Sequence, residues 1–203
     1  MARRVSALLE AAHRAVEAAL ERAARPLLAV DATAGNGHDT LFLARRVGEN
    51  GLVLACDVQR AALEAPRARL ETAGLAGRAR LALEGHEHLA RLLAVLVPDR
   101  SAPDALPGVA AAMFNLGFLP GSDKRVVTRP DTTLAALDGL LPHITPGGVI
   151  SLHLYTGHDG GAEEAAAVLS RAARLPSTAW SVLQSHVSNR ERPREYLLLL
   201  ERL

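Results

Sequence analysis

Apolar and polar positions along the chain follow two alternating patterns. Apolar residues that recur at steps of three and four, as in residues 5–24, predict helices with one buried face. Short apolar runs closed by turn residues predict buried parallel strands, because such strands are covered on both faces. The strand-like runs are residues 27–30, 53–57, 79–83, 109–115 and 149–155. The further helical patterns are residues 40–47, 60–73, 87–97, 132–141 and 163–173.

The last part of the chain departs from this rhythm. Residues 180–187 and 196–200 are two strand-like runs joined by a polar, basic turn, and they predict an antiparallel hairpin. Five strand–helix units followed by such a pair predict an α/β fold with the Rossmann-like, mostly parallel seven-stranded sheet of methyltransferases and helices on both faces. A dinucleotide-binding dehydrogenase normally ends on a parallel strand instead. The length suits a single domain, residues 1–203, with the helix of residues 1–25 packed on it.

Composition narrows the functional classes. The 23 basic and 22 acidic side chains nearly balance, so a nucleic-acid partner would need a local basic patch. Cys56 is the single cysteine, which excludes an internal disulfide and a cysteine-based zinc cluster and favours the reducing cytoplasm. No uncharged apolar stretch is long enough to cross a bilayer, so we expect a soluble protein without a membrane partner.

A glycine-bearing turn follows the first predicted strand and opens the next helix. Glycines let a ligand approach the backbone, and a helix N-terminus offers unpaired N–H groups to an anion, which in a methyltransferase is the carboxylate of S-adenosylmethionine. The spacing lacks the third glycine of the dinucleotide fingerprint, which disfavours a nicotinamide site. A tight turn with Asp39 capping the helix is the structural alternative. The candidate cofactor-binding residues are Asp31, Thr33, Gly35, Asn36, Gly37, His38, Asp39 and Thr40.

Two later strand ends extend this candidate cofactor site. Asp57 ends the second predicted strand, where an acidic side chain accepts the ribose hydroxyls of an adenosine, and Gln59 is placed to assist. Gly85 and His86 follow the third strand, at the depth expected for contacts to adenine. The structural alternative for Asp57, and also for the Gly85-His86 segment, is that the polar side chains cap the helix that follows. A glutamate between two histidines suggests a metal, but the spacing does not match a metal helix and further ligands are missing, so we expect none.

The fourth and fifth predicted strands end in a second group of polar residues. Carboxyl ends of parallel strands meet at one edge of the sheet, and in a methyltransferase the fourth faces the transferable methyl group. Asn115 is therefore a candidate both for contacting the cofactor and, with the Leu116 carbonyl, for holding an attacking amine in line. Tyr155 and His158 are candidate orienters or proton acceptors, with structural polar roles as the alternative.

Together these segments closely resemble a family once labelled "putative rRNA methylase" and now associated with tRNA (5-aminomethyl-2-thiouridine) methyltransferase. The match runs from about residue 28 to the C-terminus, whereas the first helix and the loop at 98–108 are less typical. The asparagine-leucine-glycine and glycine-histidine-x-glycine-glycine elements are far more specific than a glycine turn. The matching motifs are Asp-Ala-Thr-x-Gly-Asn-Gly-His-Asp-Thr from Asp31, Asp57-Val-Gln59, Phe114-Asn-Leu-Gly-Phe-Leu-Pro-Gly-x-Asp-Lys124, Thr132-Thr-Leu, Pro146-Gly-Gly148 and Tyr155-x-Gly-His-x-Gly-Gly161.

The resemblance implies S-adenosylmethionine-dependent N-methylation of the aminomethyl group on a wobble uridine in the tRNA anticodon, by a homodimer. A primary amine attacks once it is deprotonated, and an apolar pocket lowers its pKa, so alignment and desolvation suffice without a strong base. Two functional alternatives stay open: a methyltransferase for rRNA or a small amine, and a non-catalytic cofactor-binding module. The candidate phosphate contacts, or else solvated loop residues, are Lys124, Arg125, Arg129, Arg190, Arg192 and Arg194.

Overall fold

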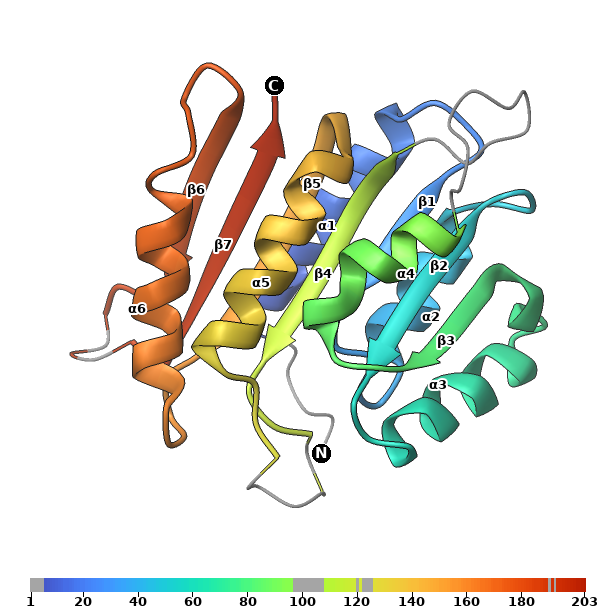
Figure 1. Cartoon of the computed structure of the whole chain (residues 1–203), viewed down its shortest axis with the longest axis horizontal. Helices are drawn as coiled ribbons and strands as arrows, with labels where there is room; N and C mark the ends of the chain where they lie inside the picture. Colours follow the sequence, from blue (N-terminus) through green and yellow to red (C-terminus); the bar gives the residue numbers. More distant parts are fainter. Residues whose placement is uncertain (1–5, 97–107, 120, 122–125, 190, 192) are drawn as a thin grey trace.

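A computed structural model describes residues 6–96, 108–119, 121, 126–189, 191 and 193–203. The strands within these residues belong to one twisted sheet (Figure 1). The strand order is β3-β2-β1-β4-β5-β7-β6. The first five strands pair in parallel, and β7 lies antiparallel between β5 and β6, so the predicted sheet and terminal hairpin are confirmed. The strands are β1 (Leu28–Asp31), β2 (Leu52–Asp57), β3 (Ala79–Leu83), β4 (Val109–Leu116), β5 (Ile144–Tyr155), β6 (Trp180–His186) and β7 (Glu195–Arg202).

Helices cover both faces of this sheet. One hydrophobic cluster joins α1, α2 and α3 to one face, and another joins α4, α5 and α6 to the other. The α-helices are α1 (Ala7–Arg22), α2 (His38–Arg46), α3 (Ala61–Thr72), α4 (Leu89–Leu96), α5 (Pro130–Leu140) and α6 (Gly161–Ala172). The short 3-10 helices are η1 (Ala76–Arg78), η2 (His86–His88) and η3 (Leu141–His143).

The N-terminal helix α1 lies directly against the sheet. Ser6 accepts a hydrogen bond from the Leu8 amide and so caps the helix. Its buried stripe packs on β4, β5 and β7, as the three- and four-residue spacing predicts. The buried residues of α1 are Leu8, Ala12, Val16, Ala19 and Leu20. This packing brings the helix over the strands that end at the candidate site.

Strand β5 begins five residues earlier than the apolar run at 149–155 predicts. Val109 of β4 pairs with Ile144, and Ala111 pairs with Val149, so residues 145–148 bulge out of the ladder. Gly147 has φ +76°, a left-handed conformation that favours glycine. The Thr-Pro-Gly-Gly sequence therefore has the composition of a turn although it lies within the span of a strand.

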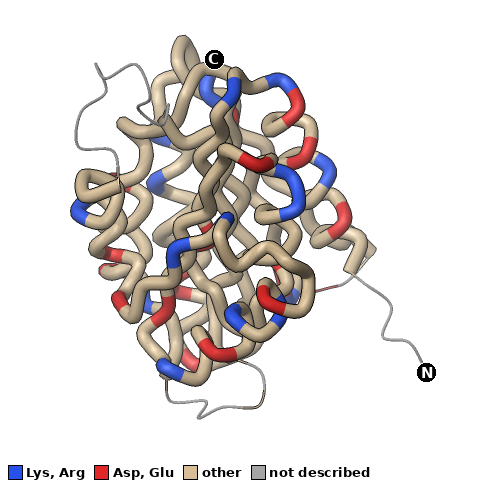
Figure 2. The backbone as a smooth tube through the Cα atoms, turned by 90° about the vertical axis from the view of Figure 1, so that its right-hand side faces the viewer, with Lys and Arg blue, Asp and Glu red and all other residues tan. Residues whose placement is uncertain are grey.

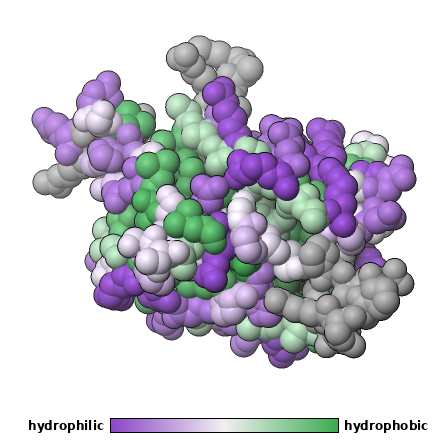
Figure 3. Space-filling model, turned by 90° about the horizontal axis from the view of Figure 1, so that it is seen from above, coloured by the Kyte–Doolittle hydropathy of each residue, from purple (hydrophilic) through white to green (hydrophobic). Residues whose placement is uncertain are grey.

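Charged, polar and apolar residues are mixed on the surface of the described residues. Basic and acidic residues are interspersed on the face that Figure 2 presents. Figure 3 looks onto the edge of the sheet where the parallel strands begin, and there hydrophobic residues lie in small groups among hydrophilic ones. Within the described part of the chain, no helix has both the length and the apolar character needed to cross a membrane.

Candidate active site

The glycine turn between β1 and α2 is pressed against α3. Gly35 and Gly37 have φ values of +51° and +76°, which favour glycine over other residues. A Cβ atom at Gly37 would lie only 2.5 Å from the Cα atom of Pro66 in α3, so a side chain has no room there. No side chain caps the N-terminus of α2, so the capping role considered for Asp39 is wrong. The N-terminus of α2 therefore has no side-chain acceptor of its own, as a site for an anion requires.

Asp57, at the tip of β2, is joined to this turn. Its Oδ2 atom accepts a hydrogen bond of 3.1 Å from the Gly35 amide, and its Oδ1 atom accepts one of 2.9 Å from the Gln59 amide. The Asp57 side chain is half-buried, and each carboxylate oxygen can accept a second hydrogen bond. The structure therefore brings the two predicted halves of the cofactor site together, with acceptor capacity left for hydroxyl groups.

Asp31 and Thr40 hold the turn from inside and offer no surface to a ligand. Asp31 Oδ1 accepts from the Thr33 amide at 3.2 Å, and Asp31 Oδ2 accepts from Thr40 Oγ1 at 2.6 Å. Both side chains are fully buried. Burial, with the nearby charge of Asp39, raises the pKa of Asp31 to about 7. The expected direct contact of Asp31 and Thr40 with the cofactor is thus corrected: they position the turn.

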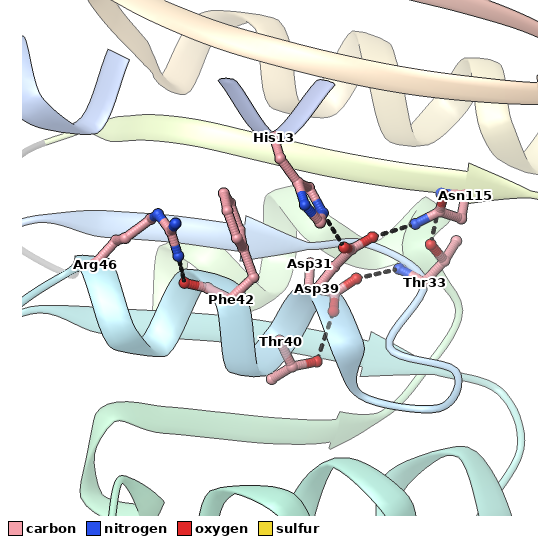
Figure 4. A network of polar contacts seen from close by, with 8 residues as sticks. All are labelled: His13, Asp31, Thr33, Asp39, Thr40, Phe42, Arg46 and Asn115. Atoms are coloured by element: carbon pink, nitrogen blue, oxygen red, sulfur yellow. Dashed lines mark hydrogen bonds and ion pairs between the residues drawn. The ribbon is translucent and has the colours of Figure 1, made fainter. Parts of the chain in front are cut away.

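Asn115, at the end of β4, is hydrogen-bonded to the same turn and to α2 (Figure 4). Its backbone N–H donates to Thr33 Oγ1 at 2.8 Å, and its side-chain Nδ2 donates to Asp39 Oδ2. Asn115 is half-buried. The neighbouring Leu116 side chain is fully buried in the hydrophobic core, so only its backbone carbonyl is a candidate for the site.

His13 on α1 is a member of this network that the sequence analysis missed. Its Nε2 atom lies 2.7 Å from Asp39 Oδ1. The imidazole stacks on the ring of Phe42 at a centroid distance of 4.0 Å, and the Arg46 guanidinium lies 3.7 Å from that ring centroid. The sequence signal is weak, because His13 merely follows the buried Ala12 at the border of an amphipathic stripe.

The ends of β4 and β5 meet where Gly117 adjoins the β5–α6 loop. A Cβ atom at Gly117 would lie 3.4 Å from His158 Nε2 and 3.8 Å from Tyr155 Cδ2. His158 Nδ1 lies 2.9 Å from the Asp159 carbonyl oxygen, whereas its buried Nε2 has no partner among the described residues. Buried polar atoms are usually hydrogen-bonded, so this nitrogen is a candidate contact for a ligand.

The buried His153 and the partly buried Glu195 form a polar pair beside this corner, which the sequence analysis also missed. His153 Nε2 lies 3.0 Å from Glu195 Oε2, and the ring stacks on Tyr155 at a centroid distance of 4.5 Å. Burial lowers the pKa of His153, and the Glu195 carboxylate opposes that shift. The pair thus supports the Tyr155 ring through the stacked imidazole.

His86, expected at the adenine, is packed beneath α5. Only 7% of the residue is exposed, and burial lowers its pKa. Its Nε2 atom lies 3.4 Å from Thr133 Oγ1, which donates to Glu164 Oε1 at 2.6 Å. Thr128 Oγ1 donates to the other oxygen of the buried Glu164 at 2.7 Å. An adenine contact from Gly85 and the His86 backbone stays a prediction. The His86 ring itself takes part in this buried series of polar contacts.

Two of the predicted RNA contacts are described, and both are exposed. Arg129 Nε lies 3.5 Å from Asp131 Oδ1. The Arg194 carbonyl accepts a hydrogen bond of 2.9 Å from the Thr156 amide, which ties the hairpin turn to the end of β5. Lys124, Arg125, Arg190 and Arg192 lie outside the described residues. The described residues contain no cluster of three histidine, cysteine or acidic side chains that could hold a metal ion.

Comparison with known sequences identifies relatives of this chain. A family model described as "Putative rRNA methylase" matches residues 53–201, well over half of the chain. The chloroplastic tRNA (mnm(5)s(2)U34)-methyltransferase of Arabidopsis thaliana is 34% identical over 166 residues, which are 79% of this chain and 58% of that protein. The chain thus spans less than two thirds of this relative's length.

Solved structures show the same architecture over the full chain. A crystal structure titled as a putative rRNA-methylase from Clostridium thermocellum superposes with a TM-score of 0.84 at 30% identity, covering 99% of this chain and 100% of that one. A putative methyltransferase from Streptococcus mutans in complex with SAH superposes with a TM-score of 0.80 at 29% identity, covering 98% and 100%. The expected fold and family are thereby confirmed: the chain belongs to the methyltransferase family described as "Putative rRNA methylase".

Proposed function

We propose that this chain transfers a methyl group from S-adenosylmethionine to the 5-aminomethyl group of a (2-thio)uridine at the wobble position of tRNA. The product is the 5-methylaminomethyl nucleoside. Membership of a methyltransferase family and the SAH in the Streptococcus mutans structure support the cofactor. The name of the Arabidopsis relative supports the tRNA substrate.

The residues at the carboxyl edge of the sheet fit S-adenosylmethionine. The half-buried Asp57 has acceptor capacity for ribose hydroxyls, and the uncapped N-terminus of α2 suits the amino-acid carboxylate. Gly37 keeps the turn free of a side chain at the point where α3 approaches. When bound, the cofactor supplies a methyl group on a positively charged sulfur. Gly35, Asn36, His38 and Gln59 remain proposed contacts around it.

The residues proposed to bind the substrate amine lie at the ends of β4 and β5. Asn115 Oδ1 and the Leu116 carbonyl are proposed to accept hydrogen bonds from the amine and hold its lone pair in line. The nitrogen–carbon bond forms as the carbon–sulfur bond breaks, and the methylated ammonium loses one proton. We assign the acceptance of that proton to His158 Nε2, which is buried and has no hydrogen-bond partner among the described residues. The Tyr155 ring, 38% exposed, is the proposed stacking surface for the base.

One observation carries the proposal. Asn115, from the Asn-Leu-Gly motif, is bonded through Thr33 to the same turn whose Gly35 amide is held by Asp57. The group proposed for the adenosyl moiety and the group proposed for the amine are therefore hydrogen-bonded to the same turn. This arrangement favours a methyltransferase for an amine over a non-catalytic binding module.

The proposal is tested by methyl transfer from labelled S-adenosylmethionine to tRNA lacking this methyl group, to rRNA and to small amines. Nucleoside mass spectrometry of the tRNA should show the aminomethyl nucleoside converted to its methylaminomethyl form, and the Asn115→Ala variant should convert far less. Label in rRNA or in a small amine alone would overturn the tRNA assignment. Cofactor binding without label in any pool would support the non-catalytic alternative. Homodimer formation stays a prediction.

A further inference from the structure

We propose that His13 of α1 is a positioning residue for methyl transfer. Acting through Asp39, it fixes the side-chain amide of Asn115 so that Asn115 Oδ1 faces the substrate amine. This inference rests on the proposed function, because it assigns the way in which the acceptor group of that site is oriented. It also makes α1, whose sequence is less typical of the family, a part of the active site.

The Asp39 carboxylate receives a separate donor on each oxygen. His13 Nε2 lies 2.7 Å from Oδ1, and Asn115 Nδ2 donates to Oδ2 (Figure 4). The Asp39 side chain is only 9% exposed, so water contributes little to its solvation. An ionised carboxylate only accepts hydrogen bonds, and a buried one is costly without donors. The two donors therefore hold Asp39 in one orientation.

The orientation of Asp39 determines which end of the Asn115 amide reaches the site. The donor end must face the carboxylate, because the opposite orientation would bring the amide oxygen against a negative charge. The backbone of Asn115 cannot move independently, since its N–H donates to Thr33 Oγ1 at 2.8 Å. The acceptor end, Oδ1, is consequently the end left for a ligand, and it is the end that an amine donor requires.

His13 is itself held in place by α2. Its ring stacks on the ring of Phe42 with an interplanar angle of 15°, and the Arg46 guanidinium lies over the Phe42 ring (Figure 4). Arg46 Nε in turn donates to Glu17 Oε1 of α1 at 2.8 Å. Two contacts between α1 and α2 thus set the position of the imidazole, so the donor reaches Asp39 with little loss of freedom on substrate binding.

Three variants separate hydrogen bonding from packing. His13→Phe keeps an aromatic ring for stacking on Phe42 but removes the donor to Asp39. His13→Gln keeps a side-chain N–H donor but removes the ring. Arg14→Ala is the matched control on the same helix, because Arg14 is 82% exposed and pairs only with the exposed Glu10 among the described contacts. Thermal unfolding of each variant checks that the fold is retained.

The expected change in kcat depends on the hydrogen-bond donor of residue 13 rather than on its ring. His13→Phe should lower kcat for methylation of the aminomethyl nucleoside in tRNA by about three- to tenfold, the effect of one lost hydrogen bond, with the Kd for SAH within twofold of wild type. His13→Gln should recover most of kcat, and Arg14→Ala should match wild type. A His13→Phe enzyme with wild-type kcat would overturn the inference. Equal losses in His13→Phe and His13→Gln would assign His13 to packing alone and overturn it too.

A second readout does not depend on turnover. Selective 15N labelling of asparagine gives the side-chain amide signal of Asn115, which its absence in Asn115→Ala identifies. We expect this signal to shift in His13→Phe and to stay near its wild-type position in His13→Gln and Arg14→Ala. An unshifted signal in His13→Phe would contradict the coupling. If wild-type protein methylates no tRNA amine while the signal shifts as expected, the proposed function fails and the His13–Asp39–Asn115 linkage stands.

Discussion

Replacing Asp57 by alanine removes the carboxylate at the tip of β2 that we assign to the ribose of the cofactor. In the structure each carboxylate oxygen accepts one backbone N–H, from Gly35 at 3.1 Å and from Gln59 at 2.9 Å. The substitution therefore acts in two ways. It deletes the acceptors for the ribose hydroxyls, and it releases the glycine turn from β2.

The size of the effect follows from the charge on the acceptor. Hydrogen bonds to a charged group contribute about 1.5 to 3 kcal/mol, so Asp57→Ala should weaken S-adenosylhomocysteine binding about 10- to 150-fold. Asp57→Asn keeps a neutral oxygen for one of the backbone donors. Its loss should be about 0.5 to 1.5 kcal/mol, or up to about tenfold. The order wild type, asparagine, alanine is thus part of the prediction.

Isothermal titration calorimetry with S-adenosylhomocysteine measures these affinities directly. Asp138→Ala is the control, because it removes a carboxylate that is 52% exposed on α5 and pairs with Arg171. Chemical denaturation of all variants separates a lost contact from a destabilised fold. An Asp57→Ala protein that binds within twofold of wild type would refute the assignment of Asp57 to the cofactor.

Three further predictions concern the other parts of the site. Asn115→Ala should lower kcat for tRNA more than it weakens cofactor binding, and equal losses in both would argue against a positioning role. Because burial raises the pKa of Asp31 from 3.8 to about 7, the folded state binds that proton more tightly, and this contribution to stability is lost as pH rises through that range. The unfolding free energy of Asp31→Asn relative to wild type, from urea titrations, should therefore increase between pH 4 and 7, and a constant difference would contradict the burial argument. Neutralising Arg190, Arg192 and Arg194 together should flatten the salt dependence of tRNA binding, whereas an unchanged slope would remove this turn from the interface.

The sequence predicted the sheet well because its strands have the composition that burial on both faces requires. Residues of β1 and most of β4 are buried, and their apolar runs stand out against the helical spacing on either side. The start of β5 was predicted too late, because a bulge around Gly147 has the composition of a turn. Local composition does not reveal that a strand resumes its pairing beyond such an irregularity.

The site was predicted where its residues follow strands directly, and missed where contacts join distant segments. Asp57 and Asn115 lie at strand ends, so topology alone brings them to one edge. His13 reaches Asp39 from a helix 26 positions earlier, and no spacing rule links those two residues. Asp31 and Thr40 were assigned to the ligand because they lie in the glycine motif, but their burial shows that a motif also contains residues that only support its shape.

We propose that the glycine turn and the tip of β2 hold one S-adenosylmethionine with its methyl group directed toward Asn115. A crystal structure with S-adenosylhomocysteine tests it most directly. We expect ribose hydroxyls within hydrogen-bonding distance of Asp57, the carboxylate at the turn of Gly35 and Gly37, and the sulfur facing Asn115. A ligand bound at another edge of the sheet, or at this edge with its sulfur turned away from Asn115, would refute this assignment.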